Sequence, residues 1–171
     1  MTETKQRDVQ VLPIAVDTLA LRSRSWNRLR FEIEYALEKG TTANSYLIKA
    51  DRTALIDPPG GSFTAIFLEE LRSHIPLDQL DYIILGHVNP NRLETLQHLL
   101  SEAPQVTIVC SNPGAVAIQA AELSLQKPLM IVKSADDELD LGQDNPLQFM
   151  PVPTPPWPDG LSTYETATCT L

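Results

Sequence analysis

The sequence predicts a layered α/β sandwich, with helices on the outside and two sheets stacked face to face between them. Short strand-like segments separated by turns fill residues 9–57, which indicates an antiparallel entry into a sheet. Between residues 63 and 132 such segments alternate with segments of helical period, the pattern of parallel βαβ units. That middle part alone fits a flavodoxin-like or a Rossmann fold equally well. The antiparallel entry and the return to strand patterns after residue 134 favour an α/β/β/α order of layers.

Length and charge narrow the classes of partner. The 171 residues are typical of a single domain with a sizeable core. The 13 basic and 22 acidic residues give a net charge of -9, which repels a phosphate backbone or an anionic lipid surface. We therefore expect no nucleic-acid partner and no membrane partner.

The termini and the cysteines indicate the compartment. The polar N-terminus has no apolar signal-peptide core, and no later run approaches the ~20 apolar residues of a membrane span. Cys110, inside an apolar strand, and Cys169, near the end, suit neither a disulfide framework nor a zinc site. We expect both thiols to be reduced and structural, and the chain to be cytoplasmic.

The entry segments read as strands. Residues 9–21 mix alternation with apolar pairs and contain Pro13, which suits an edge strand better than a helix. Residues 26–33 alternate in the same way. Residues 44–50 and 53–57 are two short strands separated by a polar turn, which predicts a hairpin.

After this hairpin the period becomes helical. The Pro-Pro-Gly-Gly of residues 58–61 interrupts the chain, Ser62 is a candidate cap, and apolar residues then recur at helical spacing up to Leu71. No phosphate-loop motif follows the glycines, so we expect a tight strand-to-helix turn there. Strands are then predicted at 82–85, 106–110 and 129–132, with helices at 93–100 and 115–123.

The last quarter returns to strands. The carboxylates between residues 136 and 144 lack the spacing of an EF-hand, so they are expected on strand edges and in a hairpin turn. Residues 151–158 are rich in proline, which predicts a rigid loop that forms a wall beside the loop of His87. Residues 161–164 and 167–171 look like two strands about a turn. Because nothing follows the second strand, the sandwich is expected to be truncated at the C-terminus.

The predicted functional site is the loop that follows the strand at 82–85. In open α/β folds ligands bind at the carboxyl ends of strands, because loop side chains and free helix N–H groups meet there. In this loop polar groups stand at alternate positions, His87, Asn89 and Asn91, and Arg92 comes next. This arrangement is typical of a metal-binding loop whose ligands have been replaced.

The same loop also has an ordinary interpretation. Pro90 forbids a regular helix before it, Asn91 can cap the helix that follows, and Glu94 completes a box-like helix N-terminus. On the residues alone the two interpretations are about equally supported, because short motifs are weak signals.

Four segments together resemble the N-terminal metallo-β-lactamase-like domain of flavodiiron proteins, above all the multi-domain kind of oxygenic photosynthetic microbes. They stand in the family's order and are far more specific as a set than singly: residues 44–48 (Asn-Ser-Tyr-Leu-Ile), 55–59 (Leu-Ile-Asp-Pro-Pro), 80–92 and 153–164. In that family the loop reads His-x-Glu-x-Asp-His and, with a further His before Trp-Pro-Asp, helps to hold a diiron centre.

Carried over by position, His87 matches the first His, Asn89 the Glu, Asn91 the Asp and Arg92 the second His. The later His falls at or beside Pro156. Replacing two carboxylates by amides and one imidazole by guanidinium raises the local charge by about three units, and a guanidinium cannot be deprotonated to coordinate. At these degenerate diiron positions we therefore expect no metal, and we expect no cofactor in this chain.

The resemblance implies a role in electron transfer. In the family NAD(P)H reduces a flavin, FMN passes electrons to the diiron centre across a dimer interface, and O₂ or sometimes NO is reduced. Residues 1–171 would be the N-terminal part of the lactamase-like domain, with flavodoxin-like and flavin reductase domains beyond it. We expect the parent protein to reduce O₂ to water as a homo- or hetero-oligomer with related subunits, and this piece alone to be inactive.

Two further functions stay open. The chain could be a non-catalytic scaffold that binds partners in a hetero-oligomer. A metallohydrolase of the same superfamily is the weaker alternative, because it too needs the His and Asp ligands. At the vacated metal site we expect His87, Asn89, Asn91 and Arg92 to line a pocket that holds water, a small anion such as chloride, or an internal bridge from Arg92 to a carboxylate, with Asp159 the first candidate.

Overall fold

The computed structural model describes residues 7–26, 30–31, 35–36 and 40–171. Its strands are β1 (Arg7–Ala15), β2 (Thr18–Ser25), β3 (Arg30–Phe31), β4 (Tyr35–Ala36), β5 (Thr41–Lys49), β6 (Thr53–Ile56), β7 (Tyr82–Ile84), β8 (Thr107–Ser111), β9 (Met130–Val132), β10 (Glu138–Asp140), β11 (Pro146–Pro151) and β12 (Leu161–Glu165). Its helices are α1 (Thr64–His74), α2 (Leu93–Glu102) and α3 (Asn112–Ala120), with short 3-10 turns η1 (Gly61–Phe63), η2 (Leu77–Gln79) and η3 (Pro90–Arg92).

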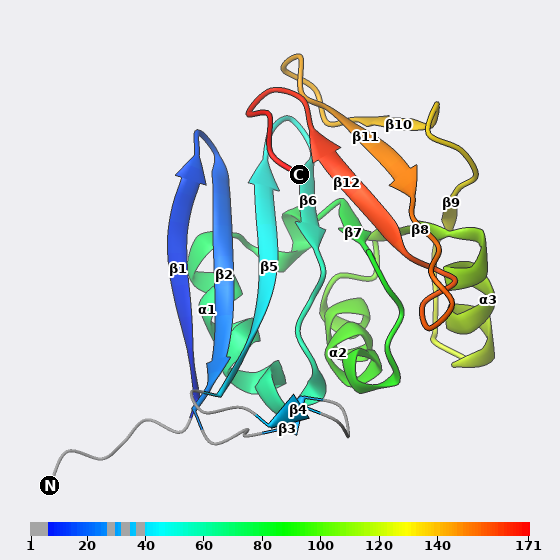
Figure 1. Cartoon of the computed structure of the whole chain (residues 1–171). Coiled ribbons are helices and arrows are strands. Elements are labelled where there is room, and N and C mark those ends of the chain that lie inside the picture. The colour runs from blue at the N-terminus through cyan, green and yellow to red at the C-terminus, as the bar shows by residue number, and fades with distance from the viewer. Residues whose placement is uncertain (1–6, 27–29, 32–34, 37–39) are drawn as a thin grey trace, which may run out of the picture.

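The main sheet has seven strands in the order β1-β2-β5-β6-β7-β8-β9 (Figure 1). Pairing is antiparallel from β1 to β6 and parallel from β6 to β9. A smaller antiparallel sheet has the order β10-β11-β12. The predicted antiparallel entry and the parallel βαβ units are therefore both confirmed, and the hairpin of residues 44–57 is β5 and β6.

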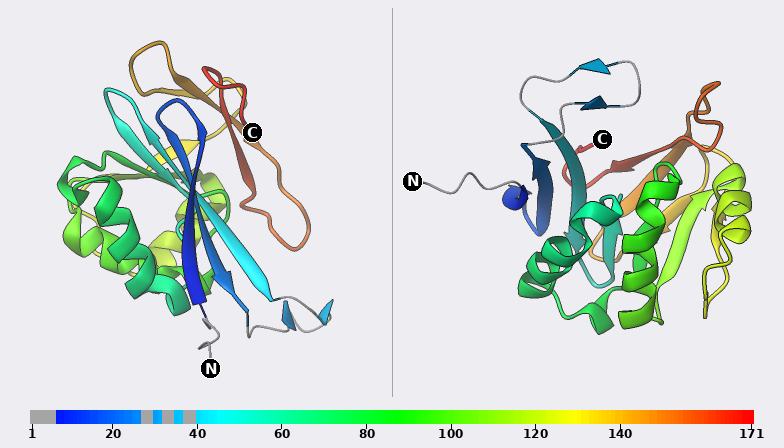
Figure 2. Two further views of the ribbon diagram at one scale, coloured as in Figure 1. Left: turned by 90° about the vertical axis from the view of Figure 1, so that its left-hand side faces the viewer. Right: turned by 90° about the horizontal axis from the view of Figure 1, so that it is seen from below.

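From β5 to β9 the main sheet buries both of its faces. A row of aligned residues, Leu47, Leu55, Ile83 and Ile108, runs across β5 to β8 and packs under the helices. On the other face, Ile84 and Val109 of the main sheet pack against the smaller sheet, which contributes Leu147, Phe149 and Leu161. Because side chains of a strand point alternately to the two faces, this double burial explains why β7 reads as an unbroken apolar run. Figure 2 shows the resulting order of layers: helices, main sheet, smaller sheet.

Two local predictions were wrong in the first half, and a third cannot be compared in full. Residues 9–21 are not one edge strand but parts of two, β1 and β2, which turn at Asp17 with a φ of 58°. β1 does lie at the edge of the sheet, as Pro13 indicated. Ser62 caps no helix, because it lies within η1. The expected strand at 26–33 falls largely outside the described residues, of which Arg30–Phe31 pairs with Tyr35–Ala36.

The end of the chain also differs from the expectation. The acidic segment forms β10, β11 and their hairpin turn as predicted. Residues 167–171, however, are not a strand: the chain turns back after β12, and a single bridge joins Glu165 to Thr170. Cys169 has a φ of 55° there, which a regular strand cannot contain. Among the described residues no helix has the length and apolar character needed to cross a bilayer.

Candidate functional site

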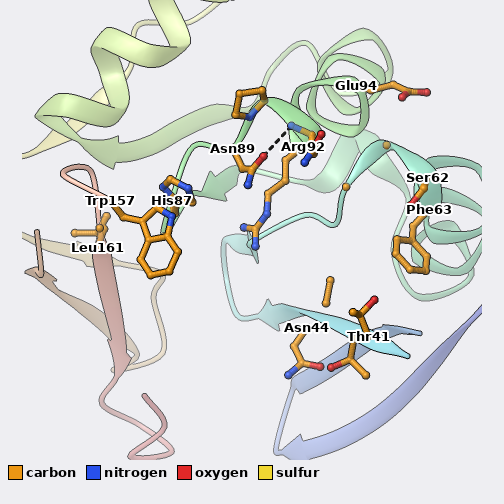
Figure 3. A pocket seen from close by; sticks show the side chains of 18 of the residues that line it. Thr41, Asn44, Ser62, Phe63, His87, Asn89, Arg92, Glu94, Trp157 and Leu161 are labelled. Carbon is orange, nitrogen blue, oxygen red and sulfur yellow. Dashed lines mark hydrogen bonds between the residues drawn. The ribbon is translucent and has the colours of Figure 1, made fainter. Parts of the chain in front are cut away.

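A pocket of about 1050 Å³ opens where β6 and β7 end, between the proline-rich loop and the start of β5. The structure brings four of the predicted residues into its wall, His87, Asn89, Asn91 and Arg92. Pro156 is exposed and lies outside the pocket, whereas its neighbour Trp157 lines it. Figure 3 shows Arg92 reaching into the middle, with His87 and Trp157 on one side and Asn44 and Thr41 on the other.

His87 is held by a buried carboxylate. Its Nδ1 lies 2.7 Å from Asp159 Oδ1, and the backbone N–H of Val88 donates to Asp159 Oδ2 at 2.7 Å. Asp159 is only 6% exposed, and its carbonyl oxygen accepts from Ser111 Oγ at 2.8 Å. A carboxylate oxygen accepts in this contact, so Nδ1 of His87 is the donor, and no described residue forms a hydrogen bond with Nε2.

Trp157 completes this side of the pocket. Its ring meets the His87 imidazole edge to face, with centroids 5.9 Å apart and planes at 60°. It is 43% exposed, at the mouth of the pocket. The prolines and the Thr154–Trp157 turn fix the loop that carries it, as expected for a rigid wall.

Arg92 is paired with Asp57. Its Nη1 donates to Asp57 Oδ1 at 2.8 Å, and the N–H of Gly86 donates to the same oxygen at 2.9 Å. The expectation that Asp159 would be the partner was therefore wrong, because Asp159 is occupied by the neighbouring histidine. Asp57 has a φ of 51°, and Ser45 Oγ donates to its carbonyl oxygen at 2.7 Å. Position 86 needs glycine, because a Cβ there would lie 2.8 Å from Asp57 Oδ2.

Asn89, rather than Asn91, caps the chain as it enters η3 and α2. Its Oδ1 accepts the N–H of Asn91 at 2.9 Å, and Pro90 follows it at the first position of the turn. Asn91 is exposed. The ordinary interpretation of this loop is thus right about the presence of a cap and wrong about the residue that supplies it.

Sequence reasoning missed Asp57 and Asn44. Asp57 directly follows β6 and precedes two prolines, so its place at the carboxyl end of a strand was a usable signal. Asn44 comes from the antiparallel strand β5, and nothing in its local sequence distinguishes it. It reaches the pocket only because β5 pairs with β6 and brings its first half across the opening.

Few groups here could hold a metal. In the part of the chain that the structure describes, no three His, Cys, Asp or Glu side chains are grouped for a metal ion. His87 offers one nitrogen. The two nearest carboxylates are already bound, Asp57 by Arg92 and Gly86, and Asp159 by His87 and Val88.

Comparison with known proteins identifies the family of the chain. Residues 41–171 match the family model described as ODP family beta lactamase. A putative diflavin flavoprotein A 4 of Nostoc sp. is 58% identical over 167 residues, which are 98% of this chain and 29% of that protein. The chain therefore spans less than a third of the length of this relative.

Two solved structures share the fold of this chain. The flavodiiron core of Flv1 from Synechocystis sp., determined after metal soaking, has a TM-score of 0.88 and 54% identity over 94% of this chain and 40% of that one. The rubredoxin oxygen:oxidoreductase of Desulfovibrio gigas has a TM-score of 0.83 at 23% identity, covering 92% of this chain and 39% of that one, a likeness that bears on the fold alone. The chain belongs to the ODP family of β-lactamase-like domains, in its flavodiiron branch.

Proposed function

We propose that residues 1–171 form the N-terminal part of the lactamase-like domain in a flavodiiron oxidoreductase subunit whose own diiron site has lost its ligands. The subunit would carry flavodoxin-like and flavin reductase domains beyond this segment. The whole protein would pass electrons from NAD(P)H through flavin and FMN to O₂, with water as the product. Related subunits would form homo- or hetero-oligomers with it in the cytoplasm of a photosynthetic microbe.

The observation that supports this proposal is the ion pair between Arg92, which lines the pocket, and Asp57 behind the pocket wall. A diiron centre needs carboxylates and imidazoles that balance its charge and leave open positions. Here a permanent cation lies among the family's ligand positions, and the flanking carboxylates are engaged by protein donors. The donor set does not fit a diiron centre, so O₂ chemistry would take place on a partner subunit.

The alternative is a scaffold without any redox role. It is favoured by one feature of the site, the pairing of both acidic groups behind the pocket wall with basic groups of the same chain, Arg92 with Asp57 and His87 with Asp159. Such a site holds its shape without a cofactor. The scaffold and the redox subunit differ in whether flavin domains accompany this segment and accept electrons.

The test uses the complete protein that contains this segment. NADH and NADPH oxidation and O₂ uptake are measured for the purified protein alone and after mixing with a related subunit that has the full His, Glu and Asp ligand set. The proposal expects flavin reduction in both cases and rapid O₂ uptake only in the mixture. O₂ uptake at full rate by the protein alone would contradict the loss of the diiron ligands. Absence of flavin reduction would favour the scaffold.

A further inference from the structure

Glu165, the last residue of β12, is a buried carboxylate with no basic partner among the described residues. It is only 3% exposed. No Lys, Arg or His side chain in the described part of the chain forms an ion pair with it. A buried charge is costly unless a counter-charge and hydrogen bonds compensate it. Glu165 is therefore a candidate ligand for a cation.

Three segments far apart in the sequence bring neutral polar groups to this carboxylate. Thr18 Oγ1, at the start of β2, donates to Glu165 Oε1 at 3.1 Å. Asn145 Nδ2, between β10 and β11, donates to the same oxygen at 3.1 Å. Thr168 Oγ1, in the turn after β12, donates to Oε2. The turns that carry these residues all lie at the upper end of the molecule in Figure 1.

One oxygen of this group has no partner. Within the described residues Asn145 Oδ1 is buried and accepts no hydrogen bond. Nδ2 is the atom of the amide that can donate to the carboxylate, so Oδ1 is the atom left over. Because the oxygen and the nitrogen of an amide share one carbon, Oδ1 also lies close to Glu165. A cation between the two side chains would give both oxygens the partner that they lack.

A cavity of about 180 Å³ adjoins Glu165 between β12 and the main sheet. Its lining includes the hydroxyl residues Thr18 and Thr170 and the apolar Ile48 and Ile56. No basic side chain belongs to the lining in the described part of the chain. The cavity has room for several water molecules, since each takes about 30 Å³ in the liquid. An ion that reaches the carboxylate can therefore keep part of its water shell.

We propose that Glu165 and Asn145 Oδ1 bind a hard metal cation of the size of Ca²⁺, together with the hydroxyl oxygens of Thr18 and Thr168. Ca²⁺ takes about six to eight oxygen ligands from carboxylates, amides and water, in a flexible geometry. A hydroxyl that rotates away from the carboxylate offers its lone pairs to the ion. A single carboxylate predicts weak binding, with a Kd of about 10⁻⁴–10⁻³ M, because affinity rises with the number of charged ligands.

This cation site is separate from the degenerate diiron positions. None of its four ligand residues lines the pocket of Arg92. Its donors are one carboxylate and neutral oxygens, whereas no three His, Cys, Asp or Glu side chains are grouped in the described residues. Such an oxygen set suits hard cations rather than iron or zinc. The proposal requires no flavin and no O₂ chemistry, so it does not depend on the proposed function.

The test is a titration of the 171-residue chain with CaCl₂, MgCl₂ and NaCl, at constant pH and with the ionic strength held by tetramethylammonium chloride. Two-dimensional ¹H–¹⁵N NMR follows the side-chain amide of Asn145 and the backbone N–H of Thr168. We expect saturable shifts with Ca²⁺. Mg²⁺ should bind at least about tenfold more weakly, because it demands a strict octahedral geometry with short bonds.

Three variants separate this site from the acidic surface. Glu165→Gln keeps the size of the side chain, removes its charge and should weaken Ca²⁺ binding by at least about tenfold. Asn145→Asp adds a second carboxylate and should strengthen binding by about tenfold, which keeps the result readable if Glu165→Gln fails to fold. Asp144→Asn is the matched control. It removes an exposed charge next to Asn145, tolerates the positive φ of that position and should leave the Kd within about twofold.

The absence of a saturable shift at Ca²⁺ concentrations about tenfold above the expected Kd would overturn the site. Unchanged affinity in Glu165→Gln or in Asn145→Asp would overturn it as well. A loss in Asp144→Asn as large as that in Glu165→Gln would show that Ca²⁺ binds to the acidic surface instead. Binding of Mg²⁺ as tight as that of Ca²⁺ would contradict the size of the ion. The O₂-uptake test is independent of these results, because it measures flavin reduction and O₂ uptake in the complete protein.

Discussion

Asp57 and Asp159 each bind one backbone N–H of the loop after β7 and one basic side chain of the pocket. Asp57 holds Gly86 and Arg92, and Asp159 holds Val88 and His87. A carboxylate that accepts both a main-chain and a side-chain bond fixes the loop without a metal ion. These four bonds fix the position of the loop after β7.

Removing Asp57 should therefore cost more stability than breaking an ordinary surface pair. Asp57→Ala leaves the N–H of Gly86 and the guanidinium of Arg92 without their acceptor, and we expect a loss of about 1–3 kcal/mol in the free energy of unfolding. Glu102→Ala breaks the more exposed Arg72 pair and should cost less than about 0.5 kcal/mol. Urea unfolding of both variants gives the two values. Equal losses would show that Asp57 does not anchor the loop.

Cys110 gives a pH-dependent prediction. Burial, and to a lesser extent the charge of Asp159, raises the pKa of its thiol to about 11 from 9.0. Above pH 9 the unfolded chain releases this proton and the folded chain retains it, so stability falls as the pH rises from 9 to 11. The fall should be on the order of 2 kcal/mol.

Urea midpoints of the wild-type chain and of Cys110→Ser at pH 8 and pH 10.5 check this expectation. The variant should lose less stability over that interval, whatever its stability at pH 8. The same loss in both proteins would mean that other groups cause it. Cys169, which is exposed, should react with a thiol reagent in the folded chain, whereas Cys110 should not.

At the scale of elements, the start of α2 depends on a side-chain cap. Asn89→Ala removes the acceptor of the Asn91 N–H and should cost about 1 kcal/mol, while Asn89→Asp retains it. Asn91→Ala is the matched control in the same turn and should be close to neutral, because its side chain is exposed. Thermal unfolding of the three variants measures the difference. A larger loss in Asn91→Ala than in Asn89→Ala would identify Asn91 as the cap.

The spacing of apolar residues in the sequence predicted those strands and helices whose faces are buried along their length. β5 to β8 and the helices between them have apolar residues that pack into one of two cores, and their patterns follow those faces. Periodicity failed for β1 and β2, because the hairpin turns at Asp17 without a glycine or a proline in the turn. It also failed for residues 167–171, where apolar and hydroxyl residues of strand type sit in a turn.

Four residues of the pocket wall were predictable from the sequence, and their contacts were not. The loop after a buried strand gave His87, Asn89, Asn91 and Arg92, since the carboxyl ends of strands are where ligand loops meet. The partner of Arg92 depends on the parallel pairing of β6 with β7, which places Asp57, directly after β6, beside the loop that follows β7. No local pattern contains that information.

For the whole molecule, β12 is one of the two edge strands of the smaller sheet in the described chain. An open strand edge is a template for pairing with another chain. We therefore expect the isolated 171-residue chain to self-associate, and Thr163→Lys, which places a charge on β12, to reduce the association. Light scattering over a concentration series measures both. A stable wild-type monomer at all concentrations would show that this edge is protected.

The iron content of the chain tests the central claim most directly. The claim is that Arg92, bound to Asp57, takes the place of metal charge in the pocket, because His87 alone offers one ligand where stable sites use about three or more. Elemental analysis of protein purified from iron-replete cells should find far less than one iron per chain. The triple variant Asn89→Glu, Asn91→Asp, Arg92→His should recover little, because Pro156 still stands at the later ligand position. About two irons in each wild-type chain, the complement of a full diiron site, would contradict the account.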